Sequence, residues 1–257
     1  MILLIGGTTE GKKAADFFEK KEICAILSCA TTYGKDSLDE YKYIRTICGR
    51  MNLEEIENFI DRENIDIIID ASHPFAVEIS KNCISAAKNK NIKYIRIERE
   101  RAEKEYGTSF DTADNIKNYI KHSEGNILFT TGSKDIDKYI DTEINMDRVY
   151  ARVIPDEASI KKCIDAGIRR KNIIAIQGPF STEFNQAVIR ELKIKIIVTK
   201  ESGISGGELE KIESAKLENI EIVLLKKPDI NYPIIFNSIE EAEDTIKYFI
   251  SIKYSEN

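Results

Sequence analysis

The chain has 257 residues, of which 42% are hydrophobic and 32% charged, and its formal net charge is −6. A chain of this length and composition folds as one large or two modest globular domains. Acidic and basic residues are interspersed, which argues against a general nucleic-acid binder, and no apolar run approaches the roughly 18 residues that a membrane span requires.

The cysteines and histidines narrow the class of protein further. Cys24, Cys29, Cys48, Cys83 and Cys163 are odd in number and include no C-x-x-C pair, as expected of reduced cysteines in a cytoplasmic protein. A core strand begins directly after the first residue, so we expect no signal peptide. Because the chain has two histidines and no cysteine pairs at ligand spacing, we expect no metal site.

Residues 1–98 alternate between short apolar runs and amphipathic helical patterns. The predicted strands are 2–6, 23–29, 43–48, 66–71 and 93–97, and the predicted helices are 10–20, 53–62 and 75–89. Continuous apolar strands that alternate with helices indicate a doubly wound parallel sheet.

A polar stretch from Glu98 to Thr112 is interpreted as the domain connection, and the alternation then starts again. The predicted helices of the second half are 112–122, 157–166, 182–191, 207–217 and 238–252, and its predicted strands are 126–131, 148–154, 173–177, 195–199 and 221–225. We therefore predict an α/β fold with two Rossmann-like domains, residues 1–98 and 99–257, whose parallel sheets flank an interdomain cleft.

The loop after the first strand, Gly6-Gly7-Thr8-Thr9-Glu10-Gly11, predicts a nucleotide site at a helix N-terminus. Gly6 and Gly11 match the first and third glycines of G-x-G-x-x-G, whereas Thr8 stands at the second. A threonine hydroxyl there could donate directly to phosphate. The alternative is an ordinary tight turn between a strand and a helix. We expect Gly6, Gly7, Thr8, Thr9 and Glu10 to contact the nucleotide.

The loop after the second strand, Ser28 to Gly34, bears on coenzyme choice. An NAD-selective site usually has an acidic residue here, and none is present. Ser28, Ala30 and Thr31 are therefore predicted to contact the adenosine half of the coenzyme, where hydroxyls could receive a 2′-phosphate. The nearest arginines, Arg45 and Arg50, come later, so NADH and NADPH both stay open.

The fourth strand leads into Asp70-Ala71-Ser72-His73-Pro74-Phe75-Ala76. Pro74 suits the first turn of a helix, which would make Ser72 or His73 the cap. Ser72 is also a candidate coenzyme contact. His73 would sit at a strand end, where it could contact coenzyme or substrate.

Loops in the second half combine glycine, hydroxyl groups and cations, as suits an anionic ligand. Thr130-Thr131-Gly132-Ser133-Lys134 and Thr199-Lys200-Glu201-Ser202-Gly203 each end a strand, and Gln177-Gly178-Pro179-Phe180-Ser181 precedes a helix. Arg152 lies inside an apolar strand, where a charge needs a partner or a ligand.

Together these segments resemble one family, the precorrin-6A reductases, including the cobalt-precorrin-6A reductases of vitamin B12 biosynthesis. The glycine turn, the aspartate–histidine–proline segment, Thr131–Lys134, Ala151–Pro155, Gln177–Ser181 and Val198–Gly203 follow the family's order across nearly the whole chain. The second and the fifth of these are the most specific.

The resemblance implies a reduced nicotinamide coenzyme, NADPH or NADH, in the N-terminal domain and a tetrapyrrole in the cleft. Hydride would pass to C19 of the macrocycle and give the 6B form. The carboxylates of the substrate would be clamped by cations. The expected substrate-binding residues are Lys134, Arg152, Gln177, Ser181, Lys200 and Ser202, with Arg96 and Arg99 as weaker candidates, and His73 is a possible proton donor or only a contact.

Two other functions stay open. Another Rossmann-type oxidoreductase would commonly need a Tyr-x-x-x-Lys pair, but Tyr43 and Tyr94 lack the lysine and Tyr139 is followed by Glu143. A non-catalytic nucleotide-binding module would have no need for the cationic loops. The sequence leaves open whether the substrate holds cobalt, and it does not give the oligomeric state.

Overall fold

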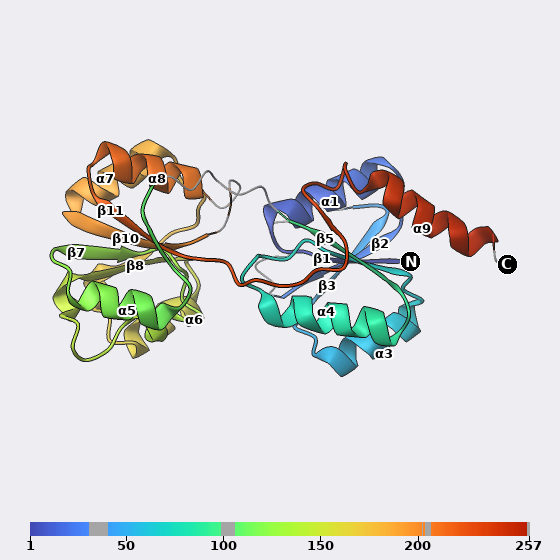
Figure 1. The fold of residues 1–257 in the computed structure, drawn as a ribbon, viewed down its shortest axis with the longest axis horizontal. Coiled ribbons are helices and arrows are strands. Elements are labelled where there is room, and N and C mark those ends of the chain that lie inside the picture. The colour runs from blue at the N-terminus through green and yellow to red at the C-terminus, as the bar shows by residue number, and fades with distance from the viewer. Residues whose placement is uncertain (31–40, 99–105, 202, 204–206, 256–257) are drawn as a thin grey trace. The chain divides into compact units, whose positions relative to one another are not determined.

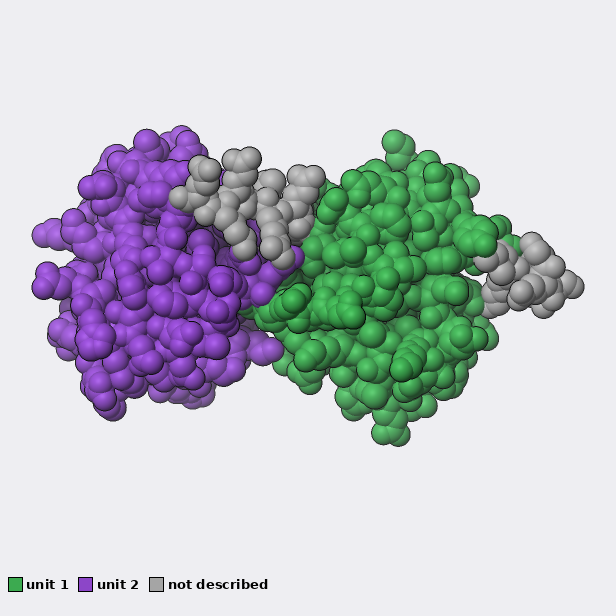
Figure 2. Space-filling view, viewed as in Figure 1, with its two compact units in different colours: residues 1–100, 228–257 green, residues 101–227 purple. Residues whose placement is uncertain are grey.

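The computed structural model describes the chain except residues 31–40, 99–105, 202, 204–206 and 256–257, and the side chains of 252–255. The chain forms two compact units (Figure 2). Unit 1 comprises residues 1–100 and 228–257, and unit 2 comprises residues 101–227. No helix in the described ranges is both long enough and apolar enough to cross a lipid bilayer.

Unit 1 is a six-stranded parallel sheet in the order β12-β5-β4-β1-β2-β3. Its strands are β1 (Ile2–Ile5), β2 (Ala25–Cys29), β3 (Ile44–Cys48), β4 (Ile67–Asp70), β5 (Lys93–Ile97) and β12 (Ile235–Phe236). Its described helices are α1 (Thr9–Lys20), α3 (Leu53–Glu63), α4 (Val77–Asn89) and α9 (Glu243–Ser255). β1 and β4, at the centre, are buried along their whole length.

Helices cover both faces of this sheet (Figure 1). Phe18 of α1 and Ile246 of α9 belong to the core on one face, and Phe59 of α3 and Cys83 of α4 to the core on the other. Local sequence fixes where these helices begin. At α3, for example, Asn52 and Glu55 form a reciprocal capping box.

Unit 2 is a second six-stranded parallel sheet, in the order β6-β11-β10-β7-β8-β9. Its strands are β6 (Thr108–Phe110), β7 (Asn126–Phe129), β8 (Val149–Val153), β9 (Ile173–Ala175), β10 (Ile194–Lys200) and β11 (Glu221–Leu225). Helices α5 (Ala113–Lys121) and α6 (Glu157–Asp165) pack on one face, and α7 (Thr182–Glu191) and α8 (Glu208–Leu217) on the other (Figure 1).

Five strands of each sheet follow the same order, β5-β4-β1-β2-β3 in unit 1 and β11-β10-β7-β8-β9 in unit 2. The sixth strand differs, because β12 follows the other five in the chain and β6 precedes them. In each sheet, the strand order reverses beside the first central strand, between β1 and β4 in unit 1 and between β7 and β10 in unit 2. Ligands of open α/β sheets bind outside the carboxyl ends of the strands at such a switch point. The predicted α/β fold with two Rossmann-like parallel sheets is therefore confirmed.

The C-terminal boundary of the second domain, placed at residue 257, was wrong. Residues 228–257 return to unit 1, where β12 pairs with β5 and Ile239 and Ala242 enter the core. Strands β6 and β12 were not predicted, because edge strands of three and two residues in polar surroundings show no apolar run.

Candidate functional site

The turn after β1 is held by the side chain of Thr8. Thr8 has an extended backbone and caps α1, since its Oγ1 accepts the N–H of Gly11 at 3.0 Å. The amides of the first helical turn have no acceptor within the helix, and the helix dipole favours negative charge there. Thr9 is exposed at this end, and Glu10 is buried beside it.

Three glycines shape the same turn. A Cβ on Gly11 would lie 2.7 Å from the Cα of Gly6, and a Cβ on Gly6 would lie 2.5 Å from Leu27 Cδ1. Gly7 has a φ of +88° and open space around it. The first and third glycines thus bring strand and helix into close contact, and the exposed backbone between them fits a phosphate at a helix N-terminus.

The turn after β4 is bonded to the turn after β1. Thr8 Oγ1 donates to the carbonyl oxygen of Ala71 at 2.6 Å, across the switch point between β1 and β4. Because this hydrogen bond uses the one hydrogen of the hydroxyl, the expected donation from Thr8 Oγ1 to phosphate does not fit the structure.

His73 lies in a β-turn rather than at a helix cap. The N–H of Ala76 donates to the carbonyl of His73 at 2.7 Å around Pro74, and α4 begins only at Val77. The expectation that Ser72 or His73 caps this helix was therefore wrong, because Pro74 occupies the second position of a turn. His73 Nδ1 accepts from the N–H of Phe75 at 3.2 Å, which assigns the hydrogen of the neutral ring to Nε2.

Arg96 is not available as a substrate clamp. It is 1% exposed, and its Nη1 lies 2.9 Å from Asp70 Oδ1. Burial lowers the pKa of Arg96, but the carboxylates of Asp70 and Glu98 outweigh burial and raise it. Arg99 lies outside the described residues. Ser72 is 7% exposed, and its hydroxyl accepts from Arg96 at 3.1 Å.

The carboxyl ends of β2 and β3 meet at one edge of unit 1. Gly49 donates its N–H to the carbonyl of Cys29 at 2.9 Å, and Arg50 follows it, exposed. Arg45 instead pairs with Glu63. Ser28 is buried and Ala30 is exposed at the same edge, whereas Thr31 lies outside the described residues.

In unit 2, the loop after β7 contacts the carboxyl end of β10 at the switch point. Thr130 donates its N–H to the carbonyl of Val198 at 2.8 Å, and Lys200 Nζ lies 3.8 Å from Asp135 Oδ2. Burial lowers the pKa of Lys200, which is half-buried, and Asp135 opposes this effect. Lys134 is exposed on the loop after β7.

Arg152 is a buried cation on β8. It is 7% exposed, its Nη1 donates to Asn185 Oδ1 at 2.8 Å, and its guanidinium lies 4.4 Å from the ring centroid of Phe180. Among the residues that the structure describes, no carboxylate forms an ion pair with it. Burial alone lowers its pKa to about 10.

A second buried cation, Lys211 on α8, was not predicted. It is 7% exposed, and its Nζ donates to Thr199 Oγ1 at 3.2 Å. Burial and the nearby charge of Arg152 lower the pKa of Lys211 to about 8, against the opposing effect of Glu208 and Glu210. No sequence signal marks this residue, because a lysine in a charged helix usually faces solvent.

Two further expected substrate residues lie between β9 and α7. Ser181 caps α7 by accepting the N–H of Phe184 at 3.2 Å, and Gln177 is exposed after β9. Ser202 lies outside the described residues. The structure therefore brings Lys200 to the switch point and Arg152 and Ser181 to α7, while their roles toward a substrate stay predictions.

The model of the family "Precorrin-6x reductase CbiJ/CobK" matches residues 1–247 of the chain. The chain belongs to this family. The cobalt-precorrin-6A reductase of Priestia megaterium is 34% identical over 246 residues, 94% of this chain and 96% of the relative. That of Methanocaldococcus jannaschii is 32% identical over 257 residues, 98% of this chain and 99% of the relative.

A solved structure of the precorrin-6A reductase CobK shares the fold, with a TM-score of 0.76 over 96% of each chain at 18% identity. The resemblance noted from the sequence is thus confirmed, and with it the enzyme class, since the family consists of oxidoreductases. A reductase of this family implies a nicotinamide coenzyme. In the described ranges, no three His, Cys, Asp or Glu side chains gather as metal ligands.

Proposed function

We propose that the chain is a cytoplasmic enzyme that reduces cobalt-precorrin-6A to its 6B form with a nicotinamide coenzyme. The observation that carries this proposal is the close Gly6–Gly11 contact at the switch point of unit 1, in a member of the precorrin-6x reductase family. The coenzyme supplies the hydride when bound. The protein binds coenzyme and substrate, orients them toward each other and provides the proton.

Unit 1 is proposed to hold the coenzyme. The backbone of Gly6 and Gly7 and the first-turn residues Thr9 and Glu10 of α1 would receive the pyrophosphate, as their place at the helix N-terminus favours. Thr8 would act through its backbone, because its side chain already bonds Ala71 and Gly11. Ser28 and Ala30 would line the adenosine side.

NADPH is the proposed coenzyme. The sequence from Ser28 to Gly34 holds no acidic residue for a ribose hydroxyl, and Arg50 is exposed where β2 and β3 end together. An exposed guanidinium at this edge suits the 2′-phosphate of NADPH, which NADH lacks.

Unit 2 is proposed to bind the carboxylates of the tetrapyrrole. Arg152 is the strongest candidate, because a buried guanidinium that bonds a neutral amide favours an anion beside it. Lys134 and Lys200 would add charge, and Gln177 and Ser181 hydrogen bonds. The cobalt form of the substrate is favoured by the names of the two relatives given above.

His73 is proposed to contact the reacting partners and to donate the proton that accompanies hydride transfer. Its Nδ1 accepts from Phe75, so the neutral ring offers its Nε2–H as a hydrogen-bond donor. To act as an acid, the ring would first take a proton from solvent on Nδ1, which breaks the bond to Phe75, and then give the Nε2 proton to the substrate. A His73→Gln enzyme with full activity and an unchanged pH profile would remove this role and leave His73 as a contact only.

The decisive experiment is an anaerobic spectrophotometric assay with precorrin-6A and cobalt-precorrin-6A, each offered with NADH and NADPH. We expect coenzyme oxidation coupled to a change in the macrocycle spectrum, fastest with cobalt-precorrin-6A and NADPH. Absence of turnover with all four pairs from folded protein would refute the function. Coenzyme binding without tetrapyrrole affinity would instead favour a non-catalytic nucleotide-binding module.

A further inference from the structure

Two buried charges in unit 1 have no part in the reaction as proposed above. Asp70, the last residue of β4, is fully buried, and Arg96 on β5 lies directly beside it, with Nη1 2.9 Å from Oδ1. Net stability is a weak reason for such a pair, because apolar side chains of similar volume often serve as well or better. What the pair holds in place therefore matters more than the pairing itself.

The pair holds Ser72 by both of its backbone polar groups and by its side chain. The N–H of Ser72 donates to Asp70 Oδ1 at 2.9 Å. Arg96 Nη2 donates to the carbonyl of Ser72 at 2.9 Å, and Nη1 donates to its hydroxyl at 3.1 Å. The planar guanidinium suits this task, since its fixed fork reaches several acceptors at once.

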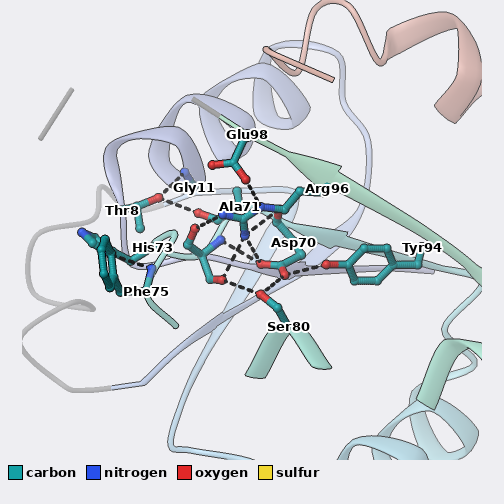
Figure 3. Close-up of polar contacts among 11 residues, drawn as sticks. Thr8, Gly11, Asp70, Ala71, His73, Phe75, Ser80, Tyr94, Arg96 and Glu98 are labelled. Atoms are coloured by element: carbon teal, nitrogen blue, oxygen red, sulfur yellow. Dashed lines mark hydrogen bonds and ion pairs between the residues drawn. The ribbon is translucent and has the colours of Figure 1, made fainter. Parts of the chain in front are cut away.

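Further side chains hold Asp70 and Arg96 in place. Asp70 Oδ2 accepts from Ser80 at 2.6 Å and from Tyr94 at 2.7 Å, and Arg96 Nε lies 3.4 Å from Glu98 Oε2 (Figure 3). Burial raises the pKa of Asp70, but Arg96 and these hydrogen bonds outweigh burial, so the pKa lies below its usual value. Asp70 therefore stays ionised and continues to accept the hydrogen bond from the N–H of Ser72.

The neighbours of Ser72 in the chain, Ala71 and His73, connect it to the proposed coenzyme site. Ala71 accepts from Thr8 at 2.6 Å, which joins this segment to the turn after β1. His73 follows Ser72, and Figure 3 shows the rings of His73 and Phe75 directed away from Arg96. A rigid buried pair on one side thus fixes the backbone from which His73 projects on the other.

We propose that Arg96, through its bonds to Ser72, is the positioning residue that sets His73 and the turn after β4 for hydride and proton transfer. This inference rests on the proposed function. The hydrogen bonds from the Arg96 guanidinium to Ser72 are needed for turnover, whereas the positive charge of Arg96 beside Asp70 is needed for folding.

Arg96→Lys separates these two contributions. Lysine keeps a positive charge beside Asp70 but cannot reach Asp70 Oδ1, the Ser72 hydroxyl and the Ser72 carbonyl with one fixed fork. Tyr94→Phe is the matched control, because it removes one hydrogen bond to Asp70 from the same buried network and leaves Ser72 bonded. Both variants, and the wild type, would be compared in melting temperature, coenzyme Kd, kcat and hydrogen exchange of residues 71–76.

We expect Arg96→Lys to lower kcat by about tenfold or more, to shift the optimum of the pH profile, and to speed exchange of the Ser72 and His73 amides. Coenzyme Kd should change little, and Tyr94→Phe should keep kcat and exchange near the wild type at a similar loss of melting temperature. Equal kcat losses in the two variants, or no change in either, would overturn the inference.

Two further outcomes keep the tests separate. If Arg96→Lys does not fold, hydrogen exchange of the wild type decides, because fast exchange of the Ser72 and His73 amides would refute a rigidly held turn. If the wild type has no turnover, the proposed function fails, and the exchange comparison between Arg96→Lys and Tyr94→Phe still decides whether Arg96 orders the turn.

Discussion

Thr8 Oγ1 donates to the carbonyl oxygen of Ala71 at 2.6 Å, although 63 residues separate them. The same oxygen accepts the N–H of Gly11 and so caps α1. One hydroxyl therefore joins the two loops that flank the switch point of unit 1 and also starts the helix between β1 and β2. The threonine at the place of the second fingerprint glycine has a structural task.

Thr8→Val tests this task, since valine keeps the shape and lacks the hydroxyl. We expect it to reduce the free energy of unfolding by about 1–2 kcal/mol, from the lost cap and the lost bond to Ala71, and to raise the coenzyme Kd. Urea unfolding and coenzyme fluorescence measure the two effects. Thr8→Ser should restore both, and Thr9→Val, at an exposed position, should leave the stability unchanged. Equal stability of Thr8→Val and the wild type would contradict the structural assignment.

Much of the fold could be predicted from the sequence because buried parallel strands are continuous apolar runs. The strand Ile2–Ile5 is predicted in this way, whereas the helix Thr182–Glu191 is predicted from its amphipathic pattern. The return of residues 228–257 to unit 1 was missed because local patterns do not say which sheet a segment joins. Ile235–Phe236 is only two residues long, and its place is set by pairing with β5.

The sequence predicts those parts of the candidate site that depend on residues close together in the chain. The turn at Gly6–Gly11 carries its own signal, whereas the bond from Thr8 to Ala71 depends on strand order. The sequence offers Arg96 as a clamp, and only its burial against Asp70 gives it a different role. Lys211 had no signal because the face of α8 that is buried cannot be read from a helix this rich in charge.

Arg50→Gln tests the coenzyme assignment. An exposed charge that meets the 2′-phosphate contributes on the order of 1 kcal/mol, so we expect the Kd for NADPH to rise several-fold and the Kd for NADH to stay the same. Arg45→Gln is the control, because Arg45 already pairs with Glu63. Binding of both coenzymes should be measured at low and high salt. An equal effect on NADPH and NADH would rule out contact with the 2′-phosphate.

Arg152→Met tests the substrate assignment through opposite effects on binding and stability. The guanidinium is buried, and no carboxylate of the described residues pairs with it, so its removal should leave the melting temperature unchanged or raise it. The KM for the tetrapyrrole should rise at least about tenfold. Arg152→Lys should give an intermediate KM. A fall in melting temperature with an unchanged KM would make Arg152 a structural residue.

Lys211 predicts how stability depends on pH. Its pKa is about 8 in the folded chain, below its ordinary value of 10.5. Between these two values the unfolded chain holds a proton that the folded chain has released, so this residue makes stability rise with pH. Relative to its value below pH 8, the free energy of unfolding gains up to about 3 kcal/mol from this residue by pH 10.5. Below pH 8 both states are protonated, and the buried charge destabilises the fold by a constant amount.

Lys211→Met isolates this contribution, because the other titrating groups cancel in the difference between variant and wild type. We expect the variant to be more stable than the wild type at pH 7, with the difference shrinking from pH 8 toward pH 10.5. Urea unfolding at pH 7, 8.5 and 10 measures it. Lys162→Met, an exposed lysine on α6, should show no such trend. A difference that stays constant across this range would mean that Lys211 keeps its proton when buried, and that the acidic side chains of Glu208 and Glu210 on the same helix compensate its charge.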